Sequence, residues 1–486
     1  MLNQVITVIC GFILPRFILM YYGSEVNGLV SSITQFLGFI ALLDLGVGAV
    51  VQSAYYKPLY EHDYRTTSLI FYASKRFFRI VASILVVYVI ALCFIYPSIT
   101  NSTFDHFYII ALIIIISISS FAQYYFAVPN QLLLNADQRL YVQSNLQILT
   151  LVLNTAVSIG LILLGCSINV VKLASAIVFL IRPAVLVIYV RKHYNIEKEC
   201  SKQHYKIDQQ WNGLAQHVAT VVMNNTDVMV LTVFSTLQNV SIYAVYYMVA
   251  NGLKMVINAF GNGYTPLLGE IYASGDENRL NKTFLNYEWL IHTLSCLLFG
   301  MAAVLIIPFV RIYTSGITDT NYIQWTFAIL LLIGQLIFCI RTPYNSMICA
   351  AGHYRQTQVS AIIEMILNIV ISITFVYKFG LIGVAIGTLV AVSFRTVYFI
   401  IYINRSVINL NIKNTVKLCI VDIIELMAVF ILDWVLCSYI SFPDTFVMWI
   451  IHAVIMLILS MAVFMGINLC LYRKNTVGIV KRIFKR

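Results

Sequence analysis

Long apolar runs recur along the whole chain, and they constrain its fold more than any other feature. A run of about 20 mostly apolar residues is long enough to cross a bilayer as a helix. Only helices and closed barrels satisfy all backbone hydrogen bonds in lipid, so we expect these runs to be helical. The sequence is 60% hydrophobic and 10% charged, whereas a soluble protein is about 25% charged. We predict an all-α integral membrane protein of about fourteen transmembrane helices.

The predicted spans follow one another with short polar connections. They cover residues 2–22, 26–54, 78–97, 106–128, 141–165, 168–191, 211–236, 240–268, 284–312, 323–350, 355–378, 380–404, 414–440 and 446–472. The first span has neither a basic segment before it nor a small-residue cleavage site, so it is not expected to be a removable signal peptide.

One stretch of the chain occurs twice, as Pro129–Tyr189 and as Pro343–Tyr402. A repeat in the same direction predicts two six-helix lobes related by an axis along the membrane normal, with a site between them. We call residues at equivalent positions of the two copies repeat mates. Three pairs of mates are 214 residues apart: Pro129 and Pro343, Asn154 and Asn368, and Ser158 and Ser372. Two further pairs are 213 residues apart: Arg182 and Arg395, and Tyr189 and Tyr402. The expected parts are lobes at 1–195 and 211–404, a polar linker at 196–210, two extra helices within 405–472 and a basic tail at 473–486.

Lys and Arg gather in alternate connections, such as the one after the second span and the one after the sixth. The connections near Asn101, Gln238 and Thr318 have none. By the positive-inside rule the basic side is cytoplasmic, with both termini inside. This distribution accounts for most of the formal net charge of +11, so we predict membrane lipids as partners and no nucleic acid. The tail is expected to lie on the inner leaflet.

The eighth span carries a polar stripe whose members are spaced three or four apart: Tyr243, Tyr247, Asn251, Lys254, Asn258 and Asn262. Residues at this spacing share one face of a helix. A charge at the bilayer centre costs about 2.5–3.5 kcal/mol on insertion scales, so such residues tend to face water or a partner. We interpret the stripe as the wall of a hydrated cavity that binds substrate. The alternative is a buried Lys254 paired with an Asp for packing.

Three carboxylates within the spans are candidates for ion coupling: Asp44, Asp227 and Glu364. Each could bind H⁺ or Na⁺, or could belong to a structural ion pair, and Asp227 could pair with Lys254. Asn224 lies on the same stripe of the seventh span as Asp227.

Two further cations are candidates for the cavity. Arg16 follows Pro15 in the first span, and Arg341 lies two residues before Pro343, where freed carbonyls could also hold it. The repeat mates Arg182 and Arg395 are at least as well explained by a shared structural role.

The sequence offers no sign of a catalytic or metal site. The eight His and ten Cys show no ligand spacing, and no phosphate-binding loop of the Walker type occurs. The connections opposite the basic side are too short for an external catalytic domain. We therefore predict a protein that is not an enzyme and holds no cofactor and no metal.

The first two spans and the connection after them contain four short motifs: Tyr22-Gly23, Gly28-Leu29, Leu43-Asp44-Leu45-Gly46-Val47-Gly48 and Tyr56-Lys57-Pro58-Leu59. In these motifs the chain resembles the Wzx-type polysaccharide flippases, in the superfamily that also contains the multidrug MATE exporters and the lipid II flippases. It extends along the chain as two six-helix lobes, a linker and two extra helices.

The resemblance implies a flippase of the bacterial cytoplasmic membrane for capsule or O-antigen type polysaccharide. The substrate would be an oligosaccharide on undecaprenyl pyrophosphate, moved from the inner to the outer leaflet by alternating access. A polysaccharide polymerase and a chain-length regulator would be possible partners. The alternatives are a MATE-like, cation-coupled multidrug exporter, which would favour an acidic cavity, and a membrane glycosyltransferase, polymerase or ligase, which would need a larger outer loop.

Overall fold

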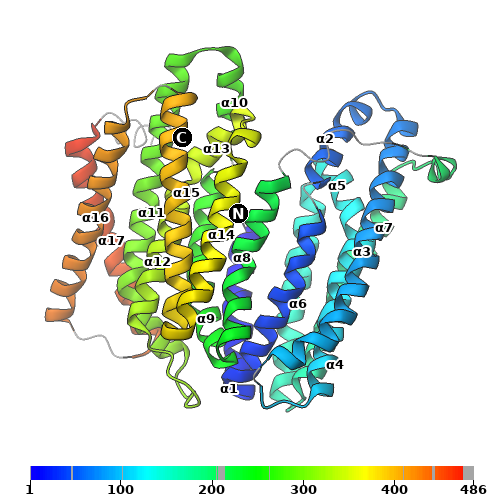
Figure 1. Cartoon of the computed structure of the whole chain (residues 1–486), viewed down its shortest axis with the longest axis horizontal. Coiled ribbons are helices and arrows are strands. Elements are labelled where there is room, and N and C mark those ends of the chain that lie inside the picture. Colours follow the sequence, from blue (N-terminus) through cyan, green and yellow to red (C-terminus); the bar gives the residue numbers. More distant parts are fainter. Residues whose placement is uncertain are drawn as a thin grey trace. The chain divides into compact units, whose positions relative to one another are not determined.

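The computed structural model describes residues 2–44, 47–100, 102–203, 205, 214–261, 263–408, 410–440 and 444–473. These residues form helices and no strand, so the predicted all-α class is confirmed (Figure 1). The helices are α1 (Leu2–Gly38), η1 (Phe39–Asp44), α2 (Val47–Tyr60), α3 (Tyr64–Ile99), α4 (His106–Ala122), η2 (Gln123–Ala127), α5 (Val128–Ala136), α6 (Leu140–Leu163), α7 (Ile168–His193), η3 (Lys198–Lys202), α8 (Leu214–Phe234), α9 (Leu237–Gly261), α10 (Tyr264–Ser274), α11 (Glu277–Tyr313), α12 (Trp325–Ile340), α13 (Thr342–Ala351), α14 (Tyr354–Phe379), α15 (Leu381–Ser406), α16 (Ile412–Tyr439) and α17 (Phe446–Leu471).

Twelve stretches of the described chain are long and apolar enough to cross a membrane, so this is a multi-pass membrane protein. The first stretch, Asn3–Leu43, is interrupted at Gly23, whose φ of 82° and ψ of 177° are not helical. The predicted break after residue 22 is therefore present. α16 is not among the twelve, because it carries Asp422, Glu425 and Asp433 along its length. These two differences account for the gap between the predicted fourteen spans and the twelve stretches.

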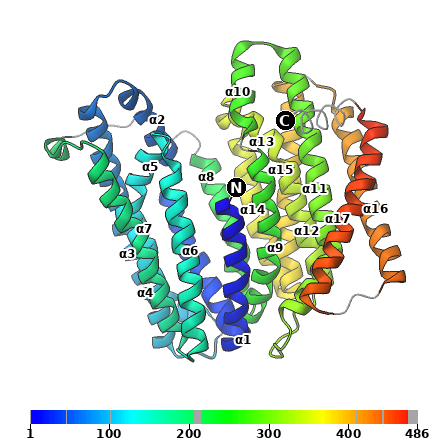
Figure 2. The same ribbon diagram turned by 180° about the vertical axis from the view of Figure 1, so that it is seen from behind.

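The chain divides into two compact units, Met1–Ile242 and Tyr243–Arg486. In the first unit the apolar core lies partly between α1, α3 and α4 and partly between α2, α5 and α7. In the second unit α16 and α17, orange and red in Figures 1 and 2, lie side by side along α11. Residues 206–210 of the predicted linker and 474–486 of the predicted tail lie outside the described residues, and the predicted lobe limits stay a prediction.

The repeat is visible in the backbone. Pro129 begins the short helix α5 and Pro343 begins the short helix α13, each within the first two helical positions, where a proline needs no N–H partner. Each short helix is followed within two residues by one with positive φ, Gln138 at 58° and Gly352 at 72°. These two residues are also 214 apart.

The repeated polar run makes the same kind of contact in both copies. The Ser158 Oγ lies 3.1 Å from the Ser175 Oγ, which joins α6 to α7. The Asn368 Nδ2 donates to the Thr388 Oγ1 at 2.9 Å, which joins α14 to α15. Small polar residues are the usual bond between helices in lipid, where no hydrophobic force drives association. In each copy the polar run therefore joins two neighbouring helices.

Further pairs of equivalent residues lie outside the repeated stretch that was found in the sequence. Asp63 caps α3 by accepting from the Thr66 N–H at 2.9 Å, and Asp276 caps α11 by accepting from the Arg279 N–H at 2.9 Å. The two caps are 213 apart. Hydrogen bonds from the side chain and backbone of Thr66 hold the pKa of the Asp63 carboxyl below its usual value.

Within the first unit α1 closely approaches α8 and the first turns of α9. The Asn27 Nδ2 donates to the Ser241 Oγ at 2.8 Å, and the Ser32 Oγ lies 2.7 Å from the Thr232 Oγ1. A Cβ on Gly28 would lie 1.9 Å from the backbone oxygen of Leu237, a separation that only a shift of the backbone could relieve.

We expect Gly28→Ala to destabilise the protein by about 1–3 kcal/mol, the usual cost of overpacking a well-packed site. Gly11→Ala is the matched control, because it lies in the same helix and its Cβ would meet nothing within 4 Å. Thermal unfolding of the purified variants in detergent measures both effects. Equal melting temperatures for the two variants would contradict the close approach.

Candidate functional site

The polar stripe of the eighth predicted span lies along α9. Tyr247, Asn251, Lys254 and Asn258 are all half-buried. The ring of Tyr247 stacks on that of Tyr243, with centroids 5.5 Å apart. Asn262 lies outside the described residues. The role of this face as a cavity wall stays a prediction.

Lys254 contacts two residues of α12. Its Nζ donates to the Gln335 Oε1 at 3.4 Å and lies 4.1 Å from the centroid of the Phe338 ring. The Arg341 Cζ lies 4.8 Å from the same centroid. Cations within about 6 Å of an aromatic face are attracted by its quadrupole. One ring therefore holds two of the predicted cavity cations near each other.

Arg341 also belongs to a buried ion triad. Its Nη1 lies 2.5 Å from the Glu364 Oε1, and the Arg395 Nη1 lies 2.5 Å from the Glu364 Oε2. The exposed fractions are 1% for Glu364, 5% for Arg395 and 7% for Arg341. Each oxygen of the Glu364 carboxyl group is therefore paired with its own guanidinium group. This arrangement is the structural ion pair that the sequence left open for Glu364.

We call Lys254, Gln335, Phe338, Arg341, Glu364 and Arg395 the cationic cluster. It draws on α9, α12, α14 and α15 of the second unit, and Arg341 stands between α12 and α13. Three cations and one carboxylate give it a net charge of +2. A net positive charge among membrane helices suits an anionic ligand, because charge-assisted bonds to phosphate strengthen in a low dielectric.

The triad has no counterpart in the first copy of the repeat. The mates of Arg341 and Glu364, 214 residues earlier, are Ala127 and Thr150. Arg182, the mate of Arg395, lines a cavity of about 440 Å³ with residues of α1, α4 and α7, and its buried Nε has no hydrogen-bond partner. Arg182 and Arg395 therefore make different contacts, although they are equivalent positions of the repeat.

The remaining predicted residues are dispersed over the first unit. Arg16 is half-buried in α1, and Asn224 is exposed on α8. Asp227 of α8 is 4% exposed. Asp44 ends η1, and its side chain lies outside the part of the chain that the structure describes.

The sequence analysis missed four buried ionisable residues. Glu288 and His292 lie on α11, and Asp422 and Glu425 lie on α16. Their spacing of four and of three residues inside apolar spans was the available signal, because such pairs share a helix face. Gln335 and Phe338, the two contacts of Lys254, were missed as well.

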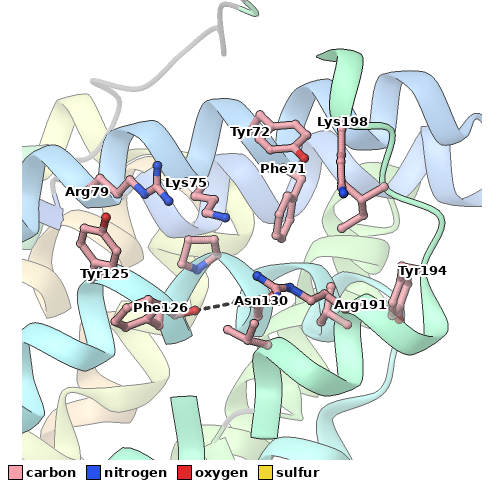
Figure 3. Close-up of a pocket in the computed structure, with 14 residues that line it drawn as sticks. Phe71, Tyr72, Lys75, Arg79, Tyr125, Phe126, Asn130, Arg191, Tyr194 and Lys198 are labelled. Carbon is pink, nitrogen blue, oxygen red and sulfur yellow. Dashed lines mark hydrogen bonds between the residues drawn. The ribbon is translucent and has the colours of Figure 1, made fainter. Parts of the chain in front are cut away.

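A basic pocket of about 550 Å³ opens in the first unit between α3, η2, α5, α7 and the segment up to η3. Its cations are Lys75, Arg79, Arg191 and Lys198, and none of its fourteen lining residues is acidic. In Figure 3 Lys75 and Arg191 reach toward the pocket from opposite walls, α3 and α7.

Aromatic rings complete the walls of this basic pocket. The Arg79 Cζ lies 5.0 Å from the centroid of Tyr125, and the Lys75 Nζ lies 5.9 Å from that of Phe71. The Tyr194 hydroxyl donates to the Asp137 Oδ2 at 2.5 Å. Burial and this carboxylate raise the pKa of the Tyr194 hydroxyl, so it remains a neutral donor.

Solved structures with this arrangement of helices belong to transporters. The lipid II flippase MurJ, in an inward closed conformation, matches with a TM-score of 0.66 and 16% identity over 97% of this chain and 98% of that one. An inward-facing multidrug resistance MATE transporter of the MOP superfamily matches with a TM-score of 0.63 and 15% identity over 82% and 95%. This chain has the MurJ and MATE fold.

A eukaryotic MATE transporter matches as well, with a TM-score of 0.54 and 14% identity over 86% of this chain and 98% of that one. No protein-family model and no curated protein matches the sequence. At these identities the likeness establishes the fold, which is the MATE-like architecture that the resemblance implied. The cargo has to be argued from the side chains.

Proposed function

We propose that this protein is a flippase for lipid-linked oligosaccharides. Its substrate would be a glycan repeat unit on undecaprenyl pyrophosphate, carried from the inner to the outer leaflet of the bacterial cytoplasmic membrane. The product would feed the synthesis of a capsule or O-antigen type polysaccharide, with a polymerase and a chain-length regulator as downstream partners. Alternating access of the two lobes would move the headgroup across.

The observation that carries this proposal is the net charge of +2 in the cationic cluster. Lys254 is its cation without a carboxylate partner among the described residues, since both oxygens of Glu364 are occupied by arginines. A pyrophosphate in a low-dielectric site needs such a fixed, uncompensated charge. A cationic drug would be repelled by it.

Amide and aromatic groups beside this charge suit a sugar. Asn251, Asn258 and Tyr247 share the face of α9 with Lys254, and Asn262 continues the spacing in sequence. Amides donate and accept hydrogen bonds with hydroxyl groups. Arg16 and Asn224 are further proposed contacts from the first unit, and Asp44 and Asp227 stay candidates for H⁺ or Na⁺ coupling. The MATE-like cation exporter is the second candidate, because the fold is equally that of MATE transporters.

Reconstitution tests the proposal directly. Purified protein is placed in liposomes that contain undecaprenyl pyrophosphate carrying a fluorescent disaccharide, and a membrane-impermeant quencher reports the outer leaflet. Protein-free liposomes are the control, and an imposed H⁺ or Na⁺ gradient tests the driving force. We expect protein-dependent movement of the glycolipid. Efflux of ethidium without movement of the glycolipid would overturn the proposal in favour of the cation exporter.

A further inference from the structure

Four ionisable side chains are buried together in the second unit, where α16 and α17 pack against α11 (Figures 1 and 2). The exposed fractions are 0% for His292, 1% for Glu425, 2% for Glu288 and 5% for Asp422. Among the described residues no Lys or Arg forms an ion pair with any of them. Three carboxylates and one imidazole in an apolar bundle are costly and need an explanation.

Glu288 is the carboxylate with the best hydrogen bonds. Its Oε1 accepts from the Tyr344 hydroxyl of α13 and, at 2.8 Å, from the Thr415 Oγ1 of α16. Two hydroxyl donors on one oxygen stabilise an ionised carboxylate without adding a charge of their own. Glu288 therefore has hydrogen-bond donors from two neighbouring helices.

Asp422 and Glu425 lie three residues apart on one face of α16. An oxygen of each, together with the Cys296 Sγ, lies within 4.8 Å of the others. Two carboxylates at this separation, shielded from water, cannot both ionise without a cation between them. The nearest basic group is His292, whose Nδ1 lies 2.7 Å from the Asp422 Oδ2.

The partners of Glu425 occupy only half of its carboxyl group. Its Oε1 accepts from the Asn468 Nδ2 at 2.6 Å, and the Asn468 Oδ1 accepts from the Trp289 Nε1 at 2.6 Å. The other oxygen, Oε2, is buried and has no hydrogen-bond partner, and neither has the His292 Nε2. A buried polar atom without a partner is costly, and a bound proton on Oε2 would relieve the charge at this position.

We propose that Asp422, Glu425 and His292 form a proton-binding site, in which the two carboxyl groups share one proton and His292 holds a second. The titratable groups that face it are Glu288 and Cys296 of α11, Tyr344 of α13, Cys419 of α16 and Tyr472 after α17. A lysine lies beside one of these groups: the Lys417 Nζ is 5.3 Å from the ring centroid of Tyr472. Asp422 and Glu425 lie on α16, which has no repeat mate, whereas His292 lies on α11. α11 also packs against α12, which carries the contacts of Lys254.

Infrared difference spectroscopy of the full-length protein in lipid nanodiscs tests this site. A protonated carboxyl group has a stretching band well separated from that of a carboxylate. We expect wild type at neutral pH to show such a band, which disappears as the pH is raised. Either Glu425→Gln or Asp422→Asn should remove the band at neutral pH, because the remaining carboxyl group then ionises alone. Glu61→Gln, at an exposed carboxylate with 53% of its side chain accessible, should leave it unchanged.

Three results would overturn the proposal. They are the absence of the band in wild type at neutral pH, its survival in both variants, and one bound zinc ion per chain by mass spectrometry, since His292, Cys419 and Asp422 could also ligate a metal. The wild-type spectrum decides even if a variant fails to fold. The measurement needs no cargo, so its failure is distinguishable from a failure of the flippase proposal.

Discussion

Lys254→Ala should lower glycolipid flipping by roughly one to two orders of magnitude while the protein still inserts and folds. A hydrogen bond to a charged group contributes about 1.5–3 kcal/mol, and each 1.4 kcal/mol is about tenfold in rate or affinity. The side chain is half-buried and its polar contact is a single neutral amide, Gln335, at 3.4 Å. Its removal therefore leaves no buried countercharge behind, and stability should change little.

The measurement is the liposome assay, normalised to folded protein. Lys254→Arg should retain part of the activity, because it keeps the charge while changing its shape. Lys413→Ala, at an exposed lysine near the start of α16, is the matched control and should flip at the wild-type rate. Full activity in Lys254→Ala would remove the cationic cluster from the transport path.

Glu364→Ala, unlike Lys254→Ala, should lower the stability of the folded protein, by about 3–5 kcal/mol. The substitution leaves Arg341 and Arg395 buried, close together and without their shared carboxylate. Breaking a buried pair is costly because the stranded charges keep their desolvation penalty. Thermal unfolding in detergent and the yield of folded protein measure the effect.

A compensated variant separates charge from packing. Replacing Glu364, Arg341 and Arg395 together by Met removes all three charges and should recover most of the lost stability. Glu61→Ala breaks the exposed pair with Lys57 and should cost no more than about 0.5 kcal/mol. A Glu364→Ala protein as stable as wild type, but unable to use an ion gradient, would return Glu364 to the role of a coupling residue.

Span positions and the repeat were readable in the sequence because both depend on local patterns. An apolar run of sufficient length must be a helix in lipid wherever it lies. The mates Pro129 and Pro343 begin equivalent short helices, since a proline acts on the backbone of its own helix. The lobe limits and the membrane orientation depend on longer-range relations and remain predictions.

The sequence did not show which cation pairs with each buried carboxylate, and Glu364 illustrates the reason. The sequence placed it, with Asp44 and Asp227, among carboxylates that either couple ions or pair with a cation. Packing brings it against Arg341, 23 residues earlier, and Arg395, 31 residues later. Nothing in the spacing distinguishes these arginines from Lys254, which instead contacts Gln335 and Phe338.

The sequence by itself determined that this chain is a repeat-built bundle of membrane helices, because hydrophobic length and helical period are properties of each segment alone. Only the tertiary structure decided which buried charges meet. It brings Asp422 and Glu425 of α16 beside His292 of α11, 130 residues from Asp422 in sequence. The energy of a buried charge depends most strongly on the groups nearest to it, and those groups come from helices that the sequence does not pair.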